Sequence, residues 1–450
     1  MRVLVLNSGS SSQKSALFEL RDAVSPDPQP PLWEAKIEWN QGSVVLKARN
    51  SRGNKTEKEV SAAERQGAIE RMLETLWSGE TAVGKNASEI NVVGHRIVHG
   101  GPKLKEPIRV TPEVKKTIAD AAAFAPLHNR AELEGIETIE RVVGPVPQVA
   151  VFDTGFHRTI PPAAALYPGP YGWQDKGIRR YGFHGINHEY CSKRAAQMLG
   201  RDISQLRIVS CHLGNGCSLA AIAGGKSVDT TMGFTPLEGL MMGTRSGSID
   251  PGILTYLLRE TGISGQEIDD ILNQRSGLLG ISGISSDMRE VEAAAQSGDQ
   301  RAQLAFDMFV HRLRKGIAGM AAVLGGADVL VFTAGIGENS SAVRAGACSG
   351  LHFLGMELDS EKNAHTSGDQ EISATNSGIR VLVIHAQEDW AIAQDCARVL
   401  NQALAAPRLA SSKLLSESVW NGRLSWQRLP QTPRADFRAF PADAHFRERG

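Results

Sequence analysis

Arginine and histidine side chains lie beside glycine-rich turns at several points of the chain, each time after an apolar run. The segment HRIVHGG holds Arg96, RRYGFHG holds His184, and MGTRSGS holds Arg245. A guanidinium presents a planar fork of donors that fits a carboxylate or a phosphate with two parallel hydrogen bonds. These segments predict the binding of small anions. Taken singly, each arginine is also compatible with a surface ion pair, and His184 with a packed core histidine.

Four stretches of small residues each follow an apolar, strand-like run: NSGSSSQK (7–14), DTGFH (153–157), HLGNGCS (212–218) and AGIGENS (334–340). Glycine allows close backbone approach, and successive backbone N–H groups form concave anion sites. No stretch fits the P-loop pattern, and no GxGxxG opens a helix after a strand. We therefore predict loops that converge on a nucleoside triphosphate. The first loop alone is equally compatible with a simple hairpin turn.

The overall composition excludes several classes of partner. Lys+Arg and Asp+Glu both number 49, so no net charge attracts nucleic acid or an anionic membrane. The five cysteines are odd in number and form no CxxC pair, which argues against a disulfide framework or a zinc site. Cys211 and Cys217, which flank a glycine-rich loop, are expected to be small buried hydrophobes.

The hydropathy pattern indicates a cytoplasmic protein. No apolar run reaches the roughly 20 residues that span a bilayer. The first strand-like run, RVLVL, is short and passes directly into a polar loop, unlike a signal peptide. We therefore expect neither a membrane nor a secretory route.

Strand-like and helical patterns alternate along most of the chain, which favours an α/β fold. Thr111-Pro112 is a suitable start for a helix that reaches about residue 123. Further helices are expected over 129–142 and 298–324. Strands are expected over 2–6, 92–98, 147–153, 207–213, 327–334 and 380–386.

An internal similarity suggests a duplicated domain. Residues 2–20 read as strand, small-residue loop, strand, and residues 207–223 repeat this order. Two copies of one domain type facing each other would leave a cleft, which is a usual place for a ligand.

Two segments fall outside this pattern. The stretch SPDPQPP (25–31) is expected to be a surface loop. Residues 407–450 carry eight Lys/Arg against four Asp/Glu with no sustained periodicity, and are expected to form a loosely ordered basic tail. A nucleic-acid-binding arm is the alternative for this tail.

Nine motifs, in this order, resemble the acetate kinase family: NSGSSSxK, HRIVHGG, APLHN, VFDTGFH, IRRYGFHG, HLGNGCS, MGFTPLEGLMMGTRSG, LLGISGISSDMR and FTAGIGENS. The resemblance covers roughly residues 1–400. It implies two duplicated ribonuclease-H-like domains of the acetate and sugar kinase/Hsp70/actin superfamily, an actin-like ATPase fold, with a cleft between them. We expect one domain over 1–155, completed by a helix around 388–405, and a nucleotide-binding domain over 156–387.

The resemblance also implies roles for individual residues. Asn7 and Glu388 would help place Mg²⁺, for which Mn²⁺ could substitute, and Arg96 would hold the acetate carboxylate. His128, Asp153, His184 and Arg245 would surround the transferred phosphoryl group. The acetate methyl group would lie in an apolar pocket formed by Val98, Leu127, Phe183 and Pro236. The ATP-binding residues would be Ser10, Ser12, Lys14, His212, Leu213, Gly214, Asn215, Gly216, Asp287, Met288, Arg289, Gly335, Ile336, Gly337, Glu338 and Asn339.

The implied reaction is the reversible transfer of the ATP γ-phosphoryl group to acetate, giving acetyl phosphate and ADP, by a homodimer that binds neither nucleic acid nor membrane. A propionate or other short-chain acyl kinase, or an ATP-driven binding module, are the alternatives. Because a carboxylic acid is already ionised at neutral pH, Asp153 need not act as a base. We predict that it orients Arg245, His184 or a metal-bound water. Ser248 and Trp390 depart from the family pattern.

Overall fold

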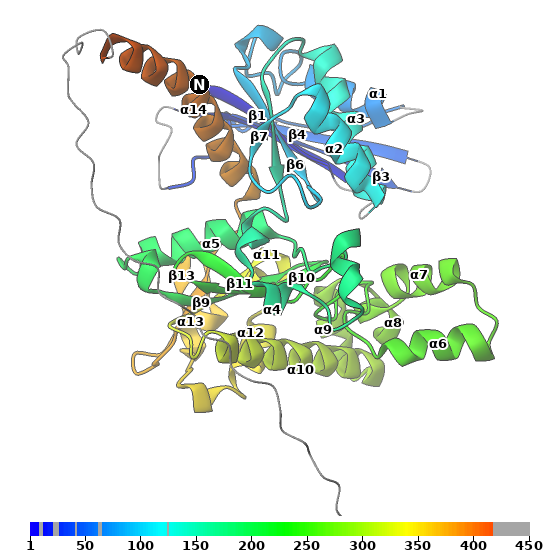
Figure 1. The fold of residues 1–450 in the computed structure, drawn as a ribbon. Coiled ribbons are helices and arrows are strands. Elements are labelled where there is room, and N and C mark those ends of the chain that lie inside the picture. The colour runs from blue at the N-terminus through cyan, green and yellow to red at the C-terminus, as the bar shows by residue number, and fades with distance from the viewer. Residues whose placement is uncertain (9–11, 21–26, 41–42, 62–64, 124–125, 417–450) are drawn as a thin grey trace, which may run out of the picture. The chain divides into compact units, whose positions relative to one another are not determined.

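The structure is a computed structural model that describes residues 1–8, 12–20, 27–40, 43–61, 65–123 and 126–416. Residues Met1–Asn401 form one compact unit and Gln402–Gly450 a second. The first unit contains two β-sheets, drawn in blue to cyan and in green to yellow in Figure 1.

The first sheet has eight strands in the order β5-β4-β3-β2-β1-β6-β8-β7. Its strands are β1 (Arg2–Ser8), β2 (Ser12–Glu19), β3 (Trp33–Asn40), β4 (Ser43–Asn50), β5 (Lys55–Glu59), β6 (Val92–Ile97), β7 (Ile108–Arg109) and β8 (Gln148–Phe152). The second sheet has six strands in the order β11-β10-β9-β12-β14-β13. These are β9 (Arg207–Leu213), β10 (Cys217–Ala223), β11 (Lys226–Thr230), β12 (Val329–Thr333), β13 (Gln370–Glu371) and β14 (Arg380–Val383).

The two sheets repeat one topology, as the sequence similarity predicts. In the first, β1 pairs antiparallel with β2, while β6 and β8 follow in parallel. In the second, β9 pairs antiparallel with β10, while β12 and β14 follow in parallel. The predicted α/β fold with two duplicated actin-like domains is confirmed. Parallel strands place their carboxyl ends at one edge of a sheet, where α/β proteins bind ligands.

Helices surround both sheets. Those of the first half are α1 (Arg65–Glu74), α2 (Pro112–Asp120), α3 (Pro126–Val142) and α4 (Pro162–Ala165). The rest are α5 (Gly185–Met198), α6 (Pro251–Glu260), α7 (Gly265–Gln274), α8 (Gly277–Ser282), α9 (Met288–Gln296), α10 (Gln300–Val323), α11 (Ala334–Asn339), α12 (Ser341–Cys348), α13 (Ser360–Ala364) and α14 (Glu388–Ser416). Short 3₁₀ turns lie at Ala87–Glu89, Ala121–Ala123, Phe156–Thr159, Tyr171–Lys176, Ile203–Gln205 and His352–Leu354.

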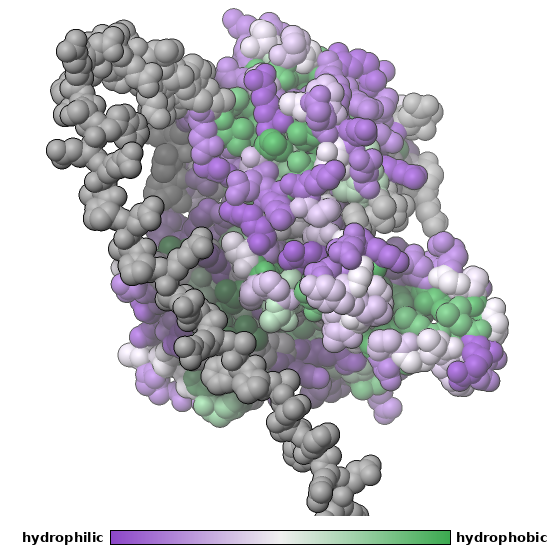
Figure 2. All heavy atoms as spheres, viewed as in Figure 1, coloured by the Kyte–Doolittle hydropathy of each residue, from purple (hydrophilic) through white to green (hydrophobic). Residues whose placement is uncertain are grey.

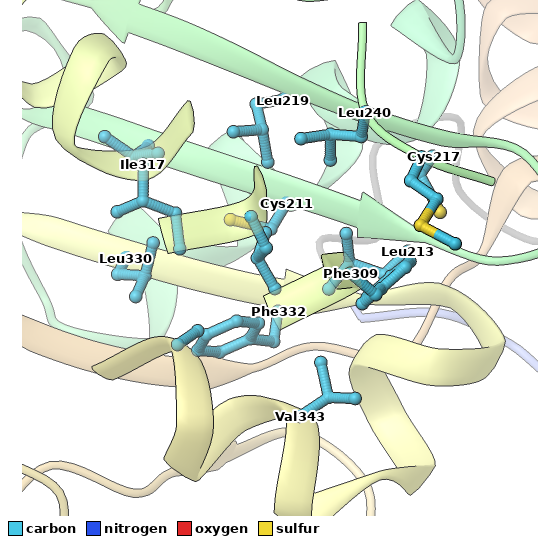
Figure 3. Close-up of a cluster of buried hydrophobic side chains, with 14 of the residues drawn as sticks. Cys211, Leu213, Cys217, Leu219, Leu240, Phe309, Ile317, Leu330, Phe332 and Val343 are labelled. Atoms are coloured by element: carbon cyan, nitrogen blue, oxygen red, sulfur yellow. The ribbon is translucent and has the colours of Figure 1, made fainter. Parts of the chain in front are cut away.

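The core of the second half lies between its sheet and α10. Phe309 and Ile317 of α10 and Val343 of α12 pack against Phe332 of β12 and its neighbours (Figure 3). Cys211 and Cys217 belong to this cluster and are fully buried, as expected for small hydrophobes. The long apolar face of α10 thus fixes the strands whose ends carry the glycine-rich loops.

Helix α14 packs against the first sheet although it follows the second in sequence. A Cβ atom added to Gly94 of β6 would lie 2.6 Å from the Cys396 sulfur and 2.7 Å from a methyl carbon of Ile392. Glycine is therefore required where helix and strand approach this closely.

Two sequence expectations need correction. The stretch AGIGENS was expected to be a loop, but residues Ala334–Asn339 form α11, whose first backbone N–H is bound by the Glu338 side chain at 2.8 Å. The basic tail was expected to begin at residue 407, but α14 continues to Ser416. Residues 417–450 lie outside the described residues. In the described part of the chain, no helix is long and apolar enough to cross a bilayer.

Candidate active site

Three polar side chains meet at the carboxyl ends of neighbouring parallel strands in the first sheet. Asn7 of β1 is the register partner of Arg96 on β6. Asp153 follows β8 directly, and its backbone N–H donates to the Ile97 carbonyl at 2.9 Å. The register therefore aligns Asn7 with Arg96 and Arg96 with Val151, and Asp153 follows two residues beyond Val151 at the same edge of the sheet.

Arg96 and Asp153 form a buried ion pair. Arg96 Nε donates to Asp153 Oδ1 at 3.2 Å, and a second nitrogen donates to Oδ2. Burial opposes the charge on Arg96, but the carboxylates of Asp153, Glu388 and Glu132 outweigh it and raise its pKa. Burial raises the pKa of Asp153 to about 6, although Arg96 acts against this. Of the partners named for Asp153 (Arg245, His184 or a metal-bound water), Arg245 is not the one that its side chain binds; the carboxylate holds Arg96.

The backbone around Asp153 also ties the two halves of the site together. The Gly185 N–H donates to the Asp153 carbonyl at 2.9 Å, at the start of α5. A Cβ atom on Gly185 would lie 2.2 Å from that carbonyl oxygen, so only glycine fits. His184, just before it, adopts the left-handed conformation with φ 57°. The two segments that carry Asp153 and His184 are thus fastened to each other.

Side-chain oxygen atoms that could bind a metal ion lie beside the Arg96–Asp153 ion pair. Asn7 Nδ2 lies 3.5 Å from Glu388 Oε2, and Glu388 lies 4.0 Å from Arg96. Burial, followed by the charge of Glu388, raises the pKa of neighbouring Asp389 to about 6. Asp389 Oδ1 is buried and has no hydrogen-bond partner among the described residues. No group of three His, Cys, Asp or Glu within the described ranges is arranged to enclose a metal.

This donor set fits a divalent cation of the magnesium type. Mg²⁺ prefers oxygen ligands, keeps several waters, and is usually held by one or two carboxylates together with substrate phosphates. The amide oxygen of Asn7 and the carboxylate of Glu388 supply such ligands, and the unpaired oxygen of Asp389 adds a third nearby. The predicted residues are thus brought together, with Asp389 in addition.

The opposite wall of the site is cationic. Arg245 is half-buried and donates to the Pro236 carbonyl at 2.6 Å, but no carboxylate in the described parts of the chain lies within ion-pairing distance. A Cβ atom on Gly216 would lie 2.7 Å from an Arg245 nitrogen and 3.3 Å from His184 Nε2. Both side chains therefore face the bare backbone of the HLGNG loop. Burial, then the charges of Arg96 and Arg245, lowers the pKa of His128 to about 4.

The predicted methyl pocket is apolar where the structure describes it. Val98 and Phe183 are buried in one hydrophobic cluster. The Pro236 carbonyl accepts a hydrogen bond from Arg245, so this proline lies beside the arginine. Leu127 lies in the first turn of α3, but its side chain is outside the described residues.

A cavity of about 790 Å³ borders the part of the site that holds Asn7, Arg96 and His184, whereas Asp153, His128 and Arg245 are not among its lining residues. It brings together predicted residues from both halves: Asn7, Ser12, Lys14, Arg96, His184, His212, Gly335, Glu338 and Glu388. Pro28–Pro31, expected in a surface loop, also line it. Ser10 lies outside the described residues.

A second cavity of about 590 Å³ begins where the first ends, at Gly335. It is lined by Gly214, Asn215, Asp287, Met288, Arg289, Gly335, Ile336 and Asn339, all predicted to bind ATP. Asp287 caps α9 and accepts from its neighbour Arg289. Leu213 and Gly337 were also predicted to bind ATP. Both are buried, and neither lines one of the two cavities.

Glu132, which no motif of the sequence pointed to, is buried next to Val98. Its carboxylate accepts from the Val98 N–H at 3.0 and 3.1 Å, and burial raises its pKa to about 8. Glu132 follows His128 by four residues in α3, so the two lie on one face of the helix. The four-residue spacing from His128 is the feature of the sequence that could have indicated Glu132.

Comparisons with known proteins identify the family of the chain. Residues 2–394 match the Acetokinase family. The acetate kinase of Gloeobacter violaceus is 58% identical over 88% of this chain and 98% of its own. A crystal structure of Porphyromonas gingivalis acetate kinase has a TM-score of 0.82 at 41% identity, covering 89% of this chain and 99% of its own. A propionate kinase structure from Francisella tularensis has a TM-score of 0.81 at 38% identity, covering 88% and 99%. The chain belongs to the acetokinase family.

Proposed function

We propose that the protein transfers the γ-phosphoryl group of ATP to acetate, reversibly and by direct in-line displacement, giving acetyl phosphate and ADP. The observation that carries this proposal is the half-buried guanidinium of Arg245, which has no carboxylate partner in the described part of the chain and stands beside His184 and His128. A cation that is partly withdrawn from water and has no charged partner is costly, so an anion is expected to occupy the site.

The arrangement suits phosphoryl transfer between two anions. The transition state is loose, so positioning and charge neutralisation matter more than covalent help. The acceptor carboxylate has no proton at neutral pH, and no base is needed. Arg96, fixed by Asp153, would hold the acceptor, while Arg245 and His184 would donate to the oxygens of the transferred group.

We further propose Mg²⁺ as the cation that accompanies ATP, placed by Asn7 and Glu388 with Asp389 close by. When bound, it neutralises phosphate charge and orients the phosphates.

One of the similar structures is a propionate kinase, so the acid that this protein prefers has to be determined separately. The deciding measurement is kcat/KM with ATP and formate, acetate, propionate or butyrate. Acetate is expected to give the highest value. ATP turnover that needs no carboxylic acid would overturn the kinase proposal in favour of an ATP-driven binding module.

Val98→Ala is expected to narrow or reverse the preference for acetate over propionate. Val98 is buried beside Phe183, and its removal makes room for one more methylene. Such a group changes discrimination by about 1–3 kcal/mol in an apolar pocket. The measurement is the ratio of kcat/KM values for the two acids, with Val110→Ala, outside the site, as a control. An unchanged ratio in Val98→Ala would remove Val98 from the pocket.

We also propose a homodimer that uses α6. None of its residues is buried, and Ile253, Tyr256 and Leu258 are 45%, 55% and 48% exposed. Figure 2 shows hydrophobic surface at the right-hand edge, where Figure 1 places α6 and α7. A contiguous exposed apolar face on a protein without net charge favours self-association.

Tyr256→Glu is therefore expected to convert a dimer into a monomer in sedimentation velocity. Phe353→Glu, at another exposed aromatic residue, serves as the matched control and should leave the dimer intact. A monomeric wild type at micromolar concentration would contradict the proposal.

We further propose a division into two domains, one formed by residues 1–155 with α14 up to about residue 405, and one formed by residues 156–387. The contact of Ile392 and Cys396 with Gly94 supports the assignment of α14 to the first domain. The composition and the lack of a described membrane-spanning helix support a cytoplasmic protein.

A further inference from the structure

A chain of three buried polar side chains, joined by hydrogen bonds, leads from the core of the second half to His184. Ser210 Oγ lies 2.9 Å from His188 Nδ1, and His188 Nε2 lies 2.8 Å from Ser218 Oγ. Ser218 Oγ in turn lies 2.9 Å from His184 Nδ1. His188, Ser210 and Ser218 are fully buried. His184 is the N-cap residue of α5, and His188 lies in the first turn, where its backbone N–H donates to the His184 carbonyl at 2.9 Å.

The positions of the serine hydroxyl protons determine which group donates and which accepts in each of these hydrogen bonds. In the described parts of the chain, Ser210 Oγ contacts no hydrogen-bond acceptor other than His188 Nδ1. If His188 Nδ1 carried the proton, the Ser210 hydroxyl would be a buried donor without an acceptor, at a cost of about 1–3 kcal/mol. Ser210 therefore donates to His188 Nδ1, and the proton of His188 lies on Nε2.

The same reasoning continues to the active site. His188 Nε2–H donates to Ser218 Oγ, and the single Ser218 proton then has His184 Nδ1 as its acceptor. With Nδ1 occupied as an acceptor, neutral His184 must carry its proton on Nε2. If every hydrogen bond ran the other way, from His184 toward Ser210, the Ser210 hydroxyl proton would have no acceptor. If His184 and His188 both donated to Ser218, the Ser218 hydroxyl proton would have no acceptor. Only one arrangement satisfies every donor.

Burial, followed by His212, His188, Arg96 and Arg245, keeps the pKa of His184 well below its ordinary value, so the ring is neutral. His212 stacks on it with ring centroids 3.9 Å apart and is neutral as well, because burial lowers its pKa to about 4. A neutral imidazole offers an anion either an attractive N–H or a repulsive lone pair. The choice of tautomer therefore decides whether His184 can assist.

We propose that His188 is a positioning residue which, through Ser210 and Ser218, fixes His184 as the Nε2–H tautomer and so aims a neutral N–H donor at the transferred phosphoryl group. The tautomer assignment stands on the hydrogen bonds alone. The purpose of the donor rests on the proposed function.

The tautomer is directly measurable in the full chain. Protein labelled with ¹⁵N in its histidines gives distinct shifts for protonated and bare ring nitrogens, and the spectrum of His184→Gln identifies the signals of His184. We expect a protonated Nε2 and a bare Nδ1 in the unliganded wild type between pH 7 and 8. A protonated Nδ1 would overturn the proposal whatever reaction the enzyme catalyses.

Variants test whether the chain sets this state. Ser210→Ala and Ser218→Ala should produce a mixture of His184 tautomers and lower kcat about tenfold or more, with KM values for both substrates within a few-fold, because a donor to the transition state is lost. His188→Gln keeps an N–H toward Ser218 and should retain more activity than His188→Leu.

Ser227→Ala is the matched control. Ser227 is equally buried and binds His157 Nδ1 at 2.8 Å, but His157 Nε2 donates to the Phe183 carbonyl at 3.0 Å, which fixes that ring independently. Ser227→Ala should leave the His184 signals and kcat unchanged. If Ser210→Ala and Ser218→Ala behave like Ser227→Ala in both measurements, the proposal is wrong. Altered tautomers with unchanged kcat would refute only the role of His184 as a donor.

Discussion

Arg245→Gln is expected to lower kcat about 10³-fold or more. An arginine that stabilises the charge of a transferring phosphoryl group contributes about 10³–10⁵ in kcat. Arg245 is suited to this task because its half-buried guanidinium lies beside His184 and is bound to the Pro236 carbonyl, with no described carboxylate to neutralise it. The measurement is kcat with saturating ATP, Mg²⁺ and acetate.

The matched variants separate charge from geometry. Arg245→Lys keeps the charge but loses the planar fork, and should recover only part of the activity. Arg141→Gln removes an exposed arginine paired with Glu70, and should leave kcat unchanged because surface pairs contribute little. A kcat for Arg245→Gln within tenfold of the wild type would exclude Arg245 from the transition state.

Asp153→Asn is expected to lower kcat/KM for acetate about 100-fold. The side chain holds Arg96 by two hydrogen bonds, and a misplacement of about 1 Å of a substrate-positioning group costs about that much. The loss should fall on acetate more than on ATP, because Arg96 is the proposed acetate ligand.

The pH profile gives the second part of this prediction. Burial raises the pKa of Asp153 to about 6, so its carboxylate is present above that pH and becomes protonated below it. Activity of the wild type should therefore decline as the pH falls through about 6, since Arg96 loses its charged partner. Asp153→Asn resembles the protonated state at every pH and should lack this decline.

A role in proton transfer would give a different result. Proton transfer would produce a solvent isotope effect on the rate of single-turnover phosphoryl transfer. If the carboxylate only positions Arg96, we expect the ratio of the rates in H₂O and D₂O to be near one. A decline of Asp153→Asn activity at the same pH as in the wild type would instead assign the titration to another group, and Asp389, with a pKa of about 6, is the next candidate.

The local sequence determined much of this protein because its signals are short-range. Alternating apolar runs and small-residue loops predicted the α/β fold, and the repeated strand–loop–strand pattern predicted two copies of one sheet topology. The motifs identified the family and most of the residues that line the two cavities. Leu213 and Gly337, carried over with their neighbours, are buried and line neither cavity, because a motif does not reveal which of its side chains face inward.

Pairings between distant residues were decided by the tertiary structure. Asp153 could have oriented any nearby cation; the register of β6 against β8 gives it to Arg96, and leaves Arg245 to a backbone carbonyl. Glu132, Asp389 and the Ser210–His188–Ser218 chain act through hydrogen bonds and desolvation across separate elements. Composition and spacing carry no trace of such contacts, because the energy of a buried polar group depends on partners that only folding brings within reach.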